Sequence, residues 1–427
     1  MLRILLAALA LAAAYPAEPE GDLDKAFDKI PFDQWLAGPE QSGLRWTVRA
    51  TRSELSYQQR LVTRVEIQVD GADLAERRNN GELVIFIQIA DQAGRRYQNH
   101  GSINLARLED GIRSQYLTYS QLAFVMPGDY RVSLALLETG TSQHSTRQFS
   151  FTVPPLKNDP LPDAWRNLPP IEFVRSVDPP ESWYQPGSDS KLSLPAVARH
   201  SIHPEVLVNL ASSERAVGRH PLPHMELNSL MTSLNVMSQL DYPASPIPVA
   251  LLDLSRQKAV FRQADVHGLE WAGIRSALAD TNPGTIDVKS LEDRSQNAAF
   301  FVKEVRRRLD APLPPGQRPM RVLIILSGVV EFEGGEDLSP IQLEEPRECR
   351  VYYFRFHSPR VARTPPPAMI FPGRRSRSGR PGWEGPSQPS DQLAGTLKPL
   401  SPRIFDIESP DQFRKALSRM LDEIASL

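Results

Sequence analysis

The chain of 427 residues contains a single cysteine, Cys349, which excludes an intramolecular disulfide. No apolar run reaches the ~20 residues that a membrane-spanning helix needs, so no membrane span is expected. An excess of one charge is also missing, because 49 Lys and Arg residues balance 51 Asp and Glu residues to a net charge of −2. That balance argues against a nucleic-acid partner. Cys349 opens an apolar run, which predicts a buried, inert thiol.

The length and composition indicate more than one domain. Hydrophobic residues make up 41% of the chain and charged residues 23%, which excludes wholesale disorder. A chain of this length exceeds what one core usually organises. We therefore expect two domains plus linkers.

Residues 1–14 have the pattern of a cleavable signal peptide. Arg3 precedes an apolar run, and the run ends in the small residues Ala12, Ala13 and Ala14. No cysteine follows that could carry a lipoprotein anchor. An exported chain without disulfides fits the bacterial envelope, so a secreted or periplasmic location is predicted.

Residues 44–153, which follow a helix-like segment over 15–43, read as antiparallel β-strands. Apolar residues alternate with polar ones over 130–136 and 149–153, and turn signals such as Asp70-Gly71 and Thr139-Gly140 separate the strands. Short strands separated by such turns predict an immunoglobulin-like β-sandwich. No catalytic spacing occurs there, which favours a structural or interaction module.

Residues 154–189 form a proline-rich stretch, which predicts an extended linker. Its two tryptophans, Trp165 and Trp183, are large apolar rings that a free linker would not need. We expect them to hold the segment against one of the domains.

Residues 190–427 alternate strands with helices. The apolar runs over 206–210, 322–326 and 351–354 lack polar alternation, as strands covered on both faces require. The last helix starts with a capping box, with Ser409 as the cap and Gln412 three residues later. It is expected to bury Phe413, Leu417, Met420, Leu421 and Ile424. This order predicts a doubly wound α/β domain of Rossmann-like type.

Three segments of this region are similar to the signature loops of von Willebrand factor A domains. These domains carry D-x-S-x-S after the first strand, a G-T loop, and a later strand ending in T/S-D-G. The counterparts here read 209–213 (NLASS), 283–285 (PGT) and 326–328 (LSG). The resemblance implies an A-like domain over 190–427. The order of signal peptide, sandwich and A-like domain also resembles exported A-domain-related proteins of acidobacteria.

In that family the three loops hold a divalent cation in a metal-ion-dependent adhesion site. This chain has Asn209, Ala211 and Gly328 where the family has Asp, Ser and Asp, and keeps only Ser213 and Thr285. A Mg²⁺ site needs hard oxygen ligands, normally with a carboxylate. The site is therefore expected to be degenerate, with no metal and no cofactor. A rival alignment places Asp253 on the first motif, but the third position fails there too.

Four histidines offer an alternative. His200, His203, His220 and His224 have spacings that zinc ligands could use, although prolines interrupt any helix that would align them. This alternative predicts a metal-dependent hydrolase or a metal-binding protein. Asp253 borders a hairpin, where a solvated turn acid is expected.

Two charged segments follow the late strands. Residues 331–348 hold seven acids and one Arg, and residues 358–383 hold six Arg and no acid. They are solvated, neutralise each other, or bind a partner. We interpret 359–400 as an insertion, so a short connector in place of 362–398 should leave folding nearly intact.

The sequence thus predicts an exported, non-enzymatic protein that binds another protein. The candidate partner-binding residues are Asn209, Ser213, Thr285, Ser327, Arg374, Arg375 and Arg377. The sequence predicts neither the identity of the partner nor an oligomeric state.

Overall fold

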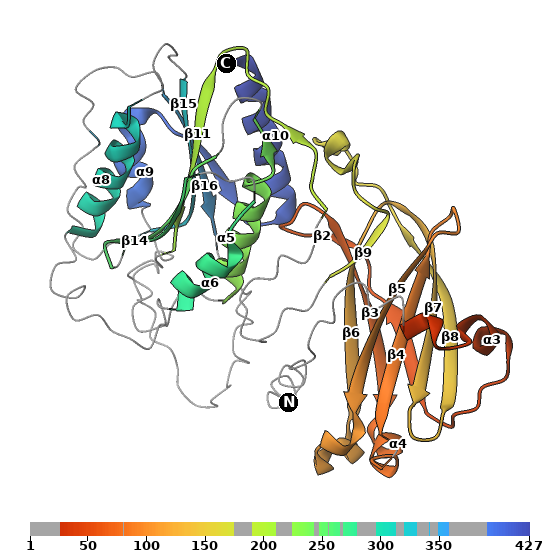
Figure 1. Ribbon diagram of the computed structural model, residues 1–427. Coiled ribbons are helices and arrows are strands. Elements are labelled where there is room, and N and C mark those ends of the chain that lie inside the picture. Colours follow the sequence, from red (N-terminus) through yellow and green to blue (C-terminus); the bar gives the residue numbers. More distant parts are fainter. Residues whose placement is uncertain are drawn as a thin grey trace, which may run out of the picture. The chain divides into compact units, whose positions relative to one another are not determined.

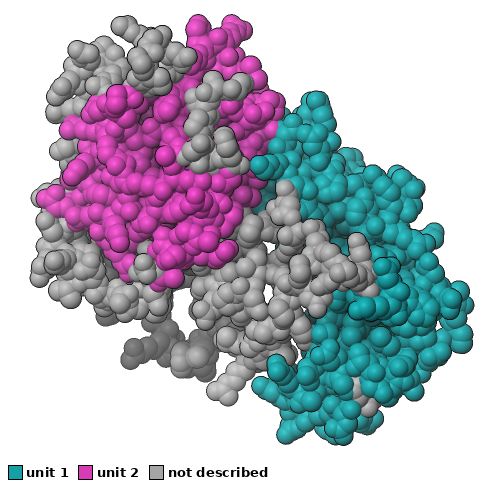
Figure 2. Space-filling view, in the orientation of Figure 1, with its two compact units in different colours: residues 1–193 teal, residues 194–427 magenta. Residues whose placement is uncertain are grey.

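The computed structural model describes most of the chain, in ranges separated by gaps. The described residues are 26–79, 81–174, 190–210, 224–242, 247–254, 256–264, 268–279, 296–312, 320–330, 341, 349–357 and 391–427. They belong to two compact units, residues 1–193 and residues 194–427 (Figure 2). Each unit has its own sheets.

Unit 1 contains two antiparallel sheets (Figure 1). The first has the order β1-β3-β6-β9, with β2 paired to β3, and the second has the order β5-β4-β7-β8. The strands of the first sheet are β1 (Trp46–Ala50), β2 (Glu54–Leu55), β3 (Leu61–Asp70), β6 (Tyr116–Val125) and β9 (Ile171–Phe173). Those of the second are β4 (Glu82–Ala90), β5 (Arg96–Asn104), β7 (Gly128–Glu138) and β8 (Gln143–Val153).

The two sheets of unit 1 contact each other through their apolar faces. Val65 and Ile67 of β3 are fully buried, while Glu66 between them is not, as the two-residue period of a strand requires. The indole Nε1 of Trp46 donates to Ser145 Oγ of β8 at 2.8 Å. A Cβ on Gly101 of β5 would lie 2.6 Å from the hydroxyl of Tyr119 on β6, so a larger residue there would force the Tyr119 ring to move.

The N-terminal segment adds the short helix α3 (Phe32–Ala37) to the second sheet. Phe27 and Phe32 are buried against Phe86 of β4 and Ala135 of β7. The ring of Trp35 stacks on that of His144, with 4.5 Å between ring centroids. These aromatic contacts make the segment part of unit 1. Two more short helical pieces, α4 (Gly71–Glu76) and the 3₁₀ turn η2 (Asp110–Ser114), lie against each other.

The chain after β8 also belongs to unit 1. Trp165 is 7% exposed, and its Nε1 donates to the carbonyl of Gln59 at 2.6 Å. The hydroxyl of Tyr130 donates to the Met126 carbonyl, and β9 then pairs with the end of β6. The expectation that Trp165 holds this segment against a domain is confirmed. Trp183 lies outside the described residues.

Unit 2 contains a mixed six-stranded sheet of order β14-β13-β11-β15-β16-β17 (Figure 1). Its strands are β11 (Ile202–Asn209), β13 (Val249–Asp253), β14 (Lys258–Gln263), β15 (Met320–Gly328), β16 (Cys349–Phe356) and β17 (Arg403–Ile407). Neighbours from β13 to β17 run parallel, and β14 runs antiparallel to β13. A separate two-stranded sheet pairs β10 (Leu194–Pro195) with β12 (Leu240–Asp241).

Few helices accompany these strands. The helices of unit 2 in the described ranges are α5 (His224–Met237), α6 (Trp271–Ala279), α8 (Gln296–Asp310), α9 (Gln392–Leu397) and α10 (Pro410–Ser426). None of the described helices is long and apolar enough to cross a membrane.

The predicted fold class, an immunoglobulin-like sandwich followed by a doubly wound α/β domain, is wrong. The described residues are mostly β-sheet, with several antiparallel sheets, and the C-terminal unit is not doubly wound. A doubly wound domain needs a crossover helix between successive parallel strands. Here β13 continues into an antiparallel neighbour, and the described part of the β15 to β16 connection holds no helix. Apolar runs reveal burial on both faces but not the connections between strands.

The Ser409 cap at the start of α10 is confirmed, and Gln412 reaches back as expected, although to the residue before the cap and not to Ser409 itself. The N–H of Gln412 donates to Ser409 Oγ at 3.3 Å, and the side-chain oxygen of Gln412 accepts from the N–H of Glu408 at 2.5 Å. The predicted apolar stripe is confirmed as well, since all of its members are buried: Phe413, Leu417, Met420, Leu421 and Ile424.

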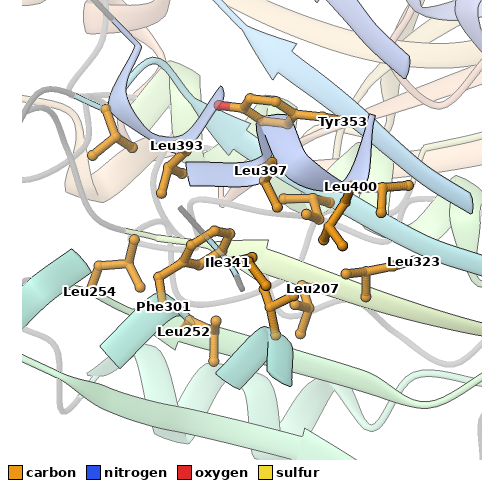
Figure 3. Close-up of a cluster of buried hydrophobic side chains, with 14 of the residues drawn as sticks. Leu207, Leu252, Leu254, Phe301, Leu323, Ile341, Tyr353, Leu393, Leu397 and Leu400 are labelled. Atoms are coloured by element: carbon orange, nitrogen blue, oxygen red, sulfur yellow. The ribbon is translucent and has the colours of Figure 1, made fainter. Parts of the chain in front are cut away.

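An apolar cluster fills one face of the mixed sheet. In Figure 3, one side of the cluster is made by Tyr353, Leu393, Leu397 and Leu400. Its other side is made by Leu252, Leu254 and Phe301. Leu393 and Leu397 of α9 are fully buried. Both lie within 359–400, the range interpreted as an insertion. The expectation that 362–398 can be replaced without loss of folding is therefore wrong, because α9 contributes to this core.

Candidate functional site

The polar residues of the site lie in one row across four parallel strands. Ser327 of β15 is in register with Arg355 of β16, and Arg355 is in register with Asp406 of β17. Asn209 ends β11, directly after the last residue of β11 that pairs with β15. We call Asn209, Ser327, Arg355 and Asp406 the polar row. Along the strands, the polar row follows the apolar cluster and lies at the carboxyl ends. Ligands of open parallel sheets usually bind at these ends.

The buried half of the polar row is neutral. Asn209 Nδ2 donates to Ser327 Oγ at 2.9 Å, and Ser327 Oγ donates to the Gly328 carbonyl at 2.7 Å. Asn209 is 1% exposed and Ser327 is fully buried. A carboxamide and a hydroxyl are thus hydrogen-bonded to each other at the ends of β11 and β15.

Tyr353 extends this buried hydrogen-bond chain. Its hydroxyl donates to the Gly328 carbonyl at 3.3 Å. Complete burial raises the pKa of the Tyr353 phenol well above its usual value, and the negative charge of Asp391 acts in the same direction. The phenol therefore stays protonated and remains a donor at neutral pH.

The outer half of the polar row is charged. Arg355 Nε donates to Asp406 Oδ1 at 2.7 Å, and Arg355 Nη1 donates to Asp391 Oδ2 at 3.1 Å. The hydrogen bond from Arg355 is the main cause that lowers the pKa of Asp406. The same bond raises the pKa of Arg355, so this ion pair remains charged across the neutral range.

The two carboxylates that Arg355 joins differ in exposure. The side chain of Asp406 is 53% exposed and also contacts His357 Nε2 at 2.7 Å. The side chain of Asp391 is 3% exposed. Its Oδ1 has no hydrogen-bond partner within the described part of the chain. Arg355 therefore balances one buried charge and one surface charge.

Only two of the predicted site residues fall in the described ranges. Asn209 and Ser327 are brought together, and both are buried. The other candidates, Ser213, Thr285, Arg374, Arg375 and Arg377, lie outside the described residues, as do most of the acidic segment 331–348 and all of 358–383.

Sequence reasoning missed Tyr353, Arg355, Asp391 and Asp406. Arg355 was visible as a charged residue inside the apolar run of β16. Its partners Asp391 and Asp406 are 36 and 51 residues away along the chain. Only the register of β16 with β17 and the packing of α9 bring the three together.

The histidines of the alternative interpretation are partly described. His200 Nδ1 contacts the carbonyl of Leu427, and His203 Nε2 lies 3.6 Å from Glu205 Oε1. Neither His220 nor the side chain of His224 is described. Among the residues that the structure covers, no three His, Cys, Asp or Glu side chains are grouped to hold a metal ion.

Asp253 and Cys349 are the remaining chemical candidates. Asp253 Oδ1 accepts from the N–H of Arg256 at 3.1 Å, and the residue is 7% exposed. The expectation of a solvated turn acid is therefore wrong for Asp253, which is a buried acceptor within the turn. Cys349 is half-buried, and burial raises the pKa of its thiol, which disfavours the thiolate needed for a nucleophile.

Comparisons with known proteins assign no family. No protein-family model matches the chain, and no curated protein matches it. A target of the Northeast Structural Genomics Consortium matches 28% of this chain and 94% of its own length, at 13% identity and a TM-score of 0.18. The putative ApaA protein from Bordetella pertussis matches 28% of this chain and 100% of its own length, at 16% identity and a TM-score of 0.18. Similarity at so low a TM-score supports no conclusion about fold or function.

Proposed function

We propose that the protein is an exported, non-enzymatic binding protein that docks a protein partner at the charged, partly exposed half of the polar row, without a metal ion. The observation that carries this proposal is the composition of the row: a neutral, mutually bonded Asn209 and Ser327 beside a charged Arg355–Asp406 pair at the strand ends. The partly exposed His357, Arg355 and Asp406 offer an imidazole, a guanidinium and a carboxylate to a partner.

The chemistry of the buried half favours binding without metal. Neutral amide and hydroxyl oxygens do not offset the dehydration of Mg²⁺. Asn209 Nδ2 donates to Ser327 and cannot ligate a cation, so the pair offers only the neutral oxygens of a carboxamide and a hydroxyl. This proposal includes a relationship to von Willebrand factor A domains, which is supported by the loop motifs alone. Ser213, Thr285, Arg374, Arg375 and Arg377 remain partner-binding candidates.

Export is proposed from residues 1–14, which carry the signal-peptide pattern. Intact-mass measurement of protein recovered after export tests it. We expect a mature chain that begins near Tyr15, and a chain that retains Met1 would contradict export.

Site-specific photo-crosslinking tests the docking site. A photoreactive phenylalanine analogue replaces Asp406 in one variant and Asp422, an exposed acid of α10, in the control. In the cell that makes the protein, we expect a discrete protein adduct from position 406 and none from position 422. The same adduct pattern from both positions, or none from position 406, would contradict docking at the polar row.

A further inference from the structure

The strand β8 forms an open edge of the second sheet of unit 1. It is last in the order β5-β4-β7-β8 and pairs with β7 over all eleven residues without a register shift. Natural edge strands are usually blunted by proline, bulges or several charges, because a bare edge pairs with other strands. The sequence of β8, QHSTRQFSFTV, has no proline or glycine and one permanently charged residue, Arg147.

The direction of the backbone groups along β8 follows from contacts near its start. The His144 carbonyl accepts from the N–H groups of Gln41 and Ser42, so the backbone of His144 points away from β7. Because N–H and C=O of one residue point to the same side of an antiparallel strand, Thr146, Gln148, Ser150 and Thr152 point outward as well.

Only the first part of this edge is covered within the described residues. Arg147 contacts Glu40, lies over the ring of Trp46 and donates to the Thr146 carbonyl at 2.8 Å. Farther along, no backbone hydrogen bond reaches Gln148 or Ser150 from outside β7 and β8 in the part of the chain that is described. Within the described residues, the outer edge of the second half of β8 is thus available to pair with an antiparallel strand.

We propose that two copies of this chain pair through β8, antiparallel and centred on Phe149. This register places Gln148 of each copy opposite Ser150 of the other. Each such pair exchanges both of its outward backbone hydrogen bonds.

The side chains of β8 are complementary to themselves in this register. Arg147 lies opposite Phe151 rather than another cation, Phe149 lies opposite its own copy, and Thr146 lies opposite Thr152. Aromatic pairs and Thr–Thr pairs are the cross-strand combinations that stabilise antiparallel ladders. Phe149 and Phe151 are both only partly buried in the single chain, so pairing would remove more of their surface from water.

Sedimentation velocity of the full mature chain over a range of concentrations tests the proposal. We expect a monomer–dimer equilibrium for the wild type. The double variant Gln148→Lys/Ser150→Lys places lysine opposite lysine twice, and we expect it to raise the dimer Kd about tenfold or more. The variant Gln148→Glu/Ser150→Glu should dissociate similarly, and a mixture of the two should restore the dimer through opposite charges.

Thr118→Lys/Ser120→Lys is the matched control, because it adds the same charge to two exposed positions of β6, a strand of the other sheet of unit 1. It should dimerise like the wild type. Restoration by the mixed Lys and Glu copies separates lost pairing from lost folding. The proposal is overturned by a wild type that stays monomeric, by a Lys variant that dimerises unchanged, by a mixture that stays monomeric, or by a control that dissociates equally.

Discussion

Asn209 and Ser327 lie side by side at the ends of two parallel strands, and the amide of Asn209 donates to the hydroxyl of Ser327 across 2.9 Å. Both side chains are buried, so the groups buried at the ends of these two strands are neutral. An acid at position 209 would have to be buried there as well.

Asn209→Asp should destabilise unit 2 by about 1–3 kcal/mol, because it removes the donor to Ser327 and buries an acceptor in its place. Burial raises the pKa of the new carboxyl. The loss of stability should therefore grow as pH rises from about 4 toward the folded-state pKa. Urea unfolding at pH 5 and pH 8 measures it, with the exposed Asn228→Asp as control. Equal stability of wild type and variant at both pH values would contradict the buried bond.

Divalent metals should leave the wild-type melting temperature unchanged. The reason is that Asn209 and Ser327 offer only neutral groups, and no carboxylate, to Mg²⁺ or Mn²⁺. Calorimetry with and without each ion is the measurement. A saturable rise of the melting temperature that Ser327→Ala abolishes would show that the polar row holds a metal.

Arg355→Gln should cost more stability than Asp406→Asn. Removing Arg355 leaves the carboxylate of Asp391, 3% exposed, without its ion pair, at a cost of up to about 3 kcal/mol. Removing Asp406 breaks a pair that solvent screens, worth under about 1 kcal/mol. Denaturant unfolding of the two variants makes the comparison. The double variant Arg355→Gln/Asp391→Asn should recover part of the loss, and no recovery would argue against Asp391 as the cause.

The pH dependence of the Arg355–Asp406 pair has a defined sign. The pKa of Asp406 is lowered in the folded state, so its contribution is present above the unfolded-state pKa and is lost as pH falls through the folded-state value. Between about pH 5 and pH 2, wild type should therefore lose more stability than Asp406→Asn. Parallel acid titrations monitored by circular dichroism measure the difference, and identical curves would show that the pair adds nothing.

Leu397→Ala should destabilise unit 2 by about 2–5 kcal/mol, because the side chain is fully buried in the apolar cluster. Lys398→Ala, next along the chain and exposed, is the control and should change stability by less than about 0.5 kcal/mol. Thermal unfolding measures both. If Leu397→Ala behaved like the control, α9 would not belong to the core.

Trp165→Ala should destabilise unit 1 by about 3–5 kcal/mol, since a buried indole and its bond to the Gln59 carbonyl are lost. Trp165→Phe should cost less, because it keeps most of the apolar contact. The exposed neighbour Arg166→Ala serves as control. A Trp165→Ala variant as stable as this control would mean that residues 154–170 are a free linker.

Local features of the chain were predictable because they depend on neighbours in sequence. Ser409 and Gln412 lie three residues apart, so the helix cap and its hydrogen bond from the Gln412 N–H to Ser409 could be expected. The stripe of α10 follows from the helical period, and the burial of Trp165 from the cost of exposing an indole. In each case the chemistry acts over a single turn or a single side chain.

The sequence by itself determined which segments are apolar, where α10 begins, and that Asn209 and Gly328 cannot supply carboxylates to a metal. Tertiary structure alone decided that β14 runs antiparallel, that α9 belongs to the core, and that Asp391 and Asp406 meet at Arg355. The physical reason is that hydrophobic period and capping act between near neighbours, whereas strand register and ion pairing join residues that are far apart in the chain. No spacing rule predicts which distant carboxylate reaches a given guanidinium, because the whole sheet must form before the two can meet.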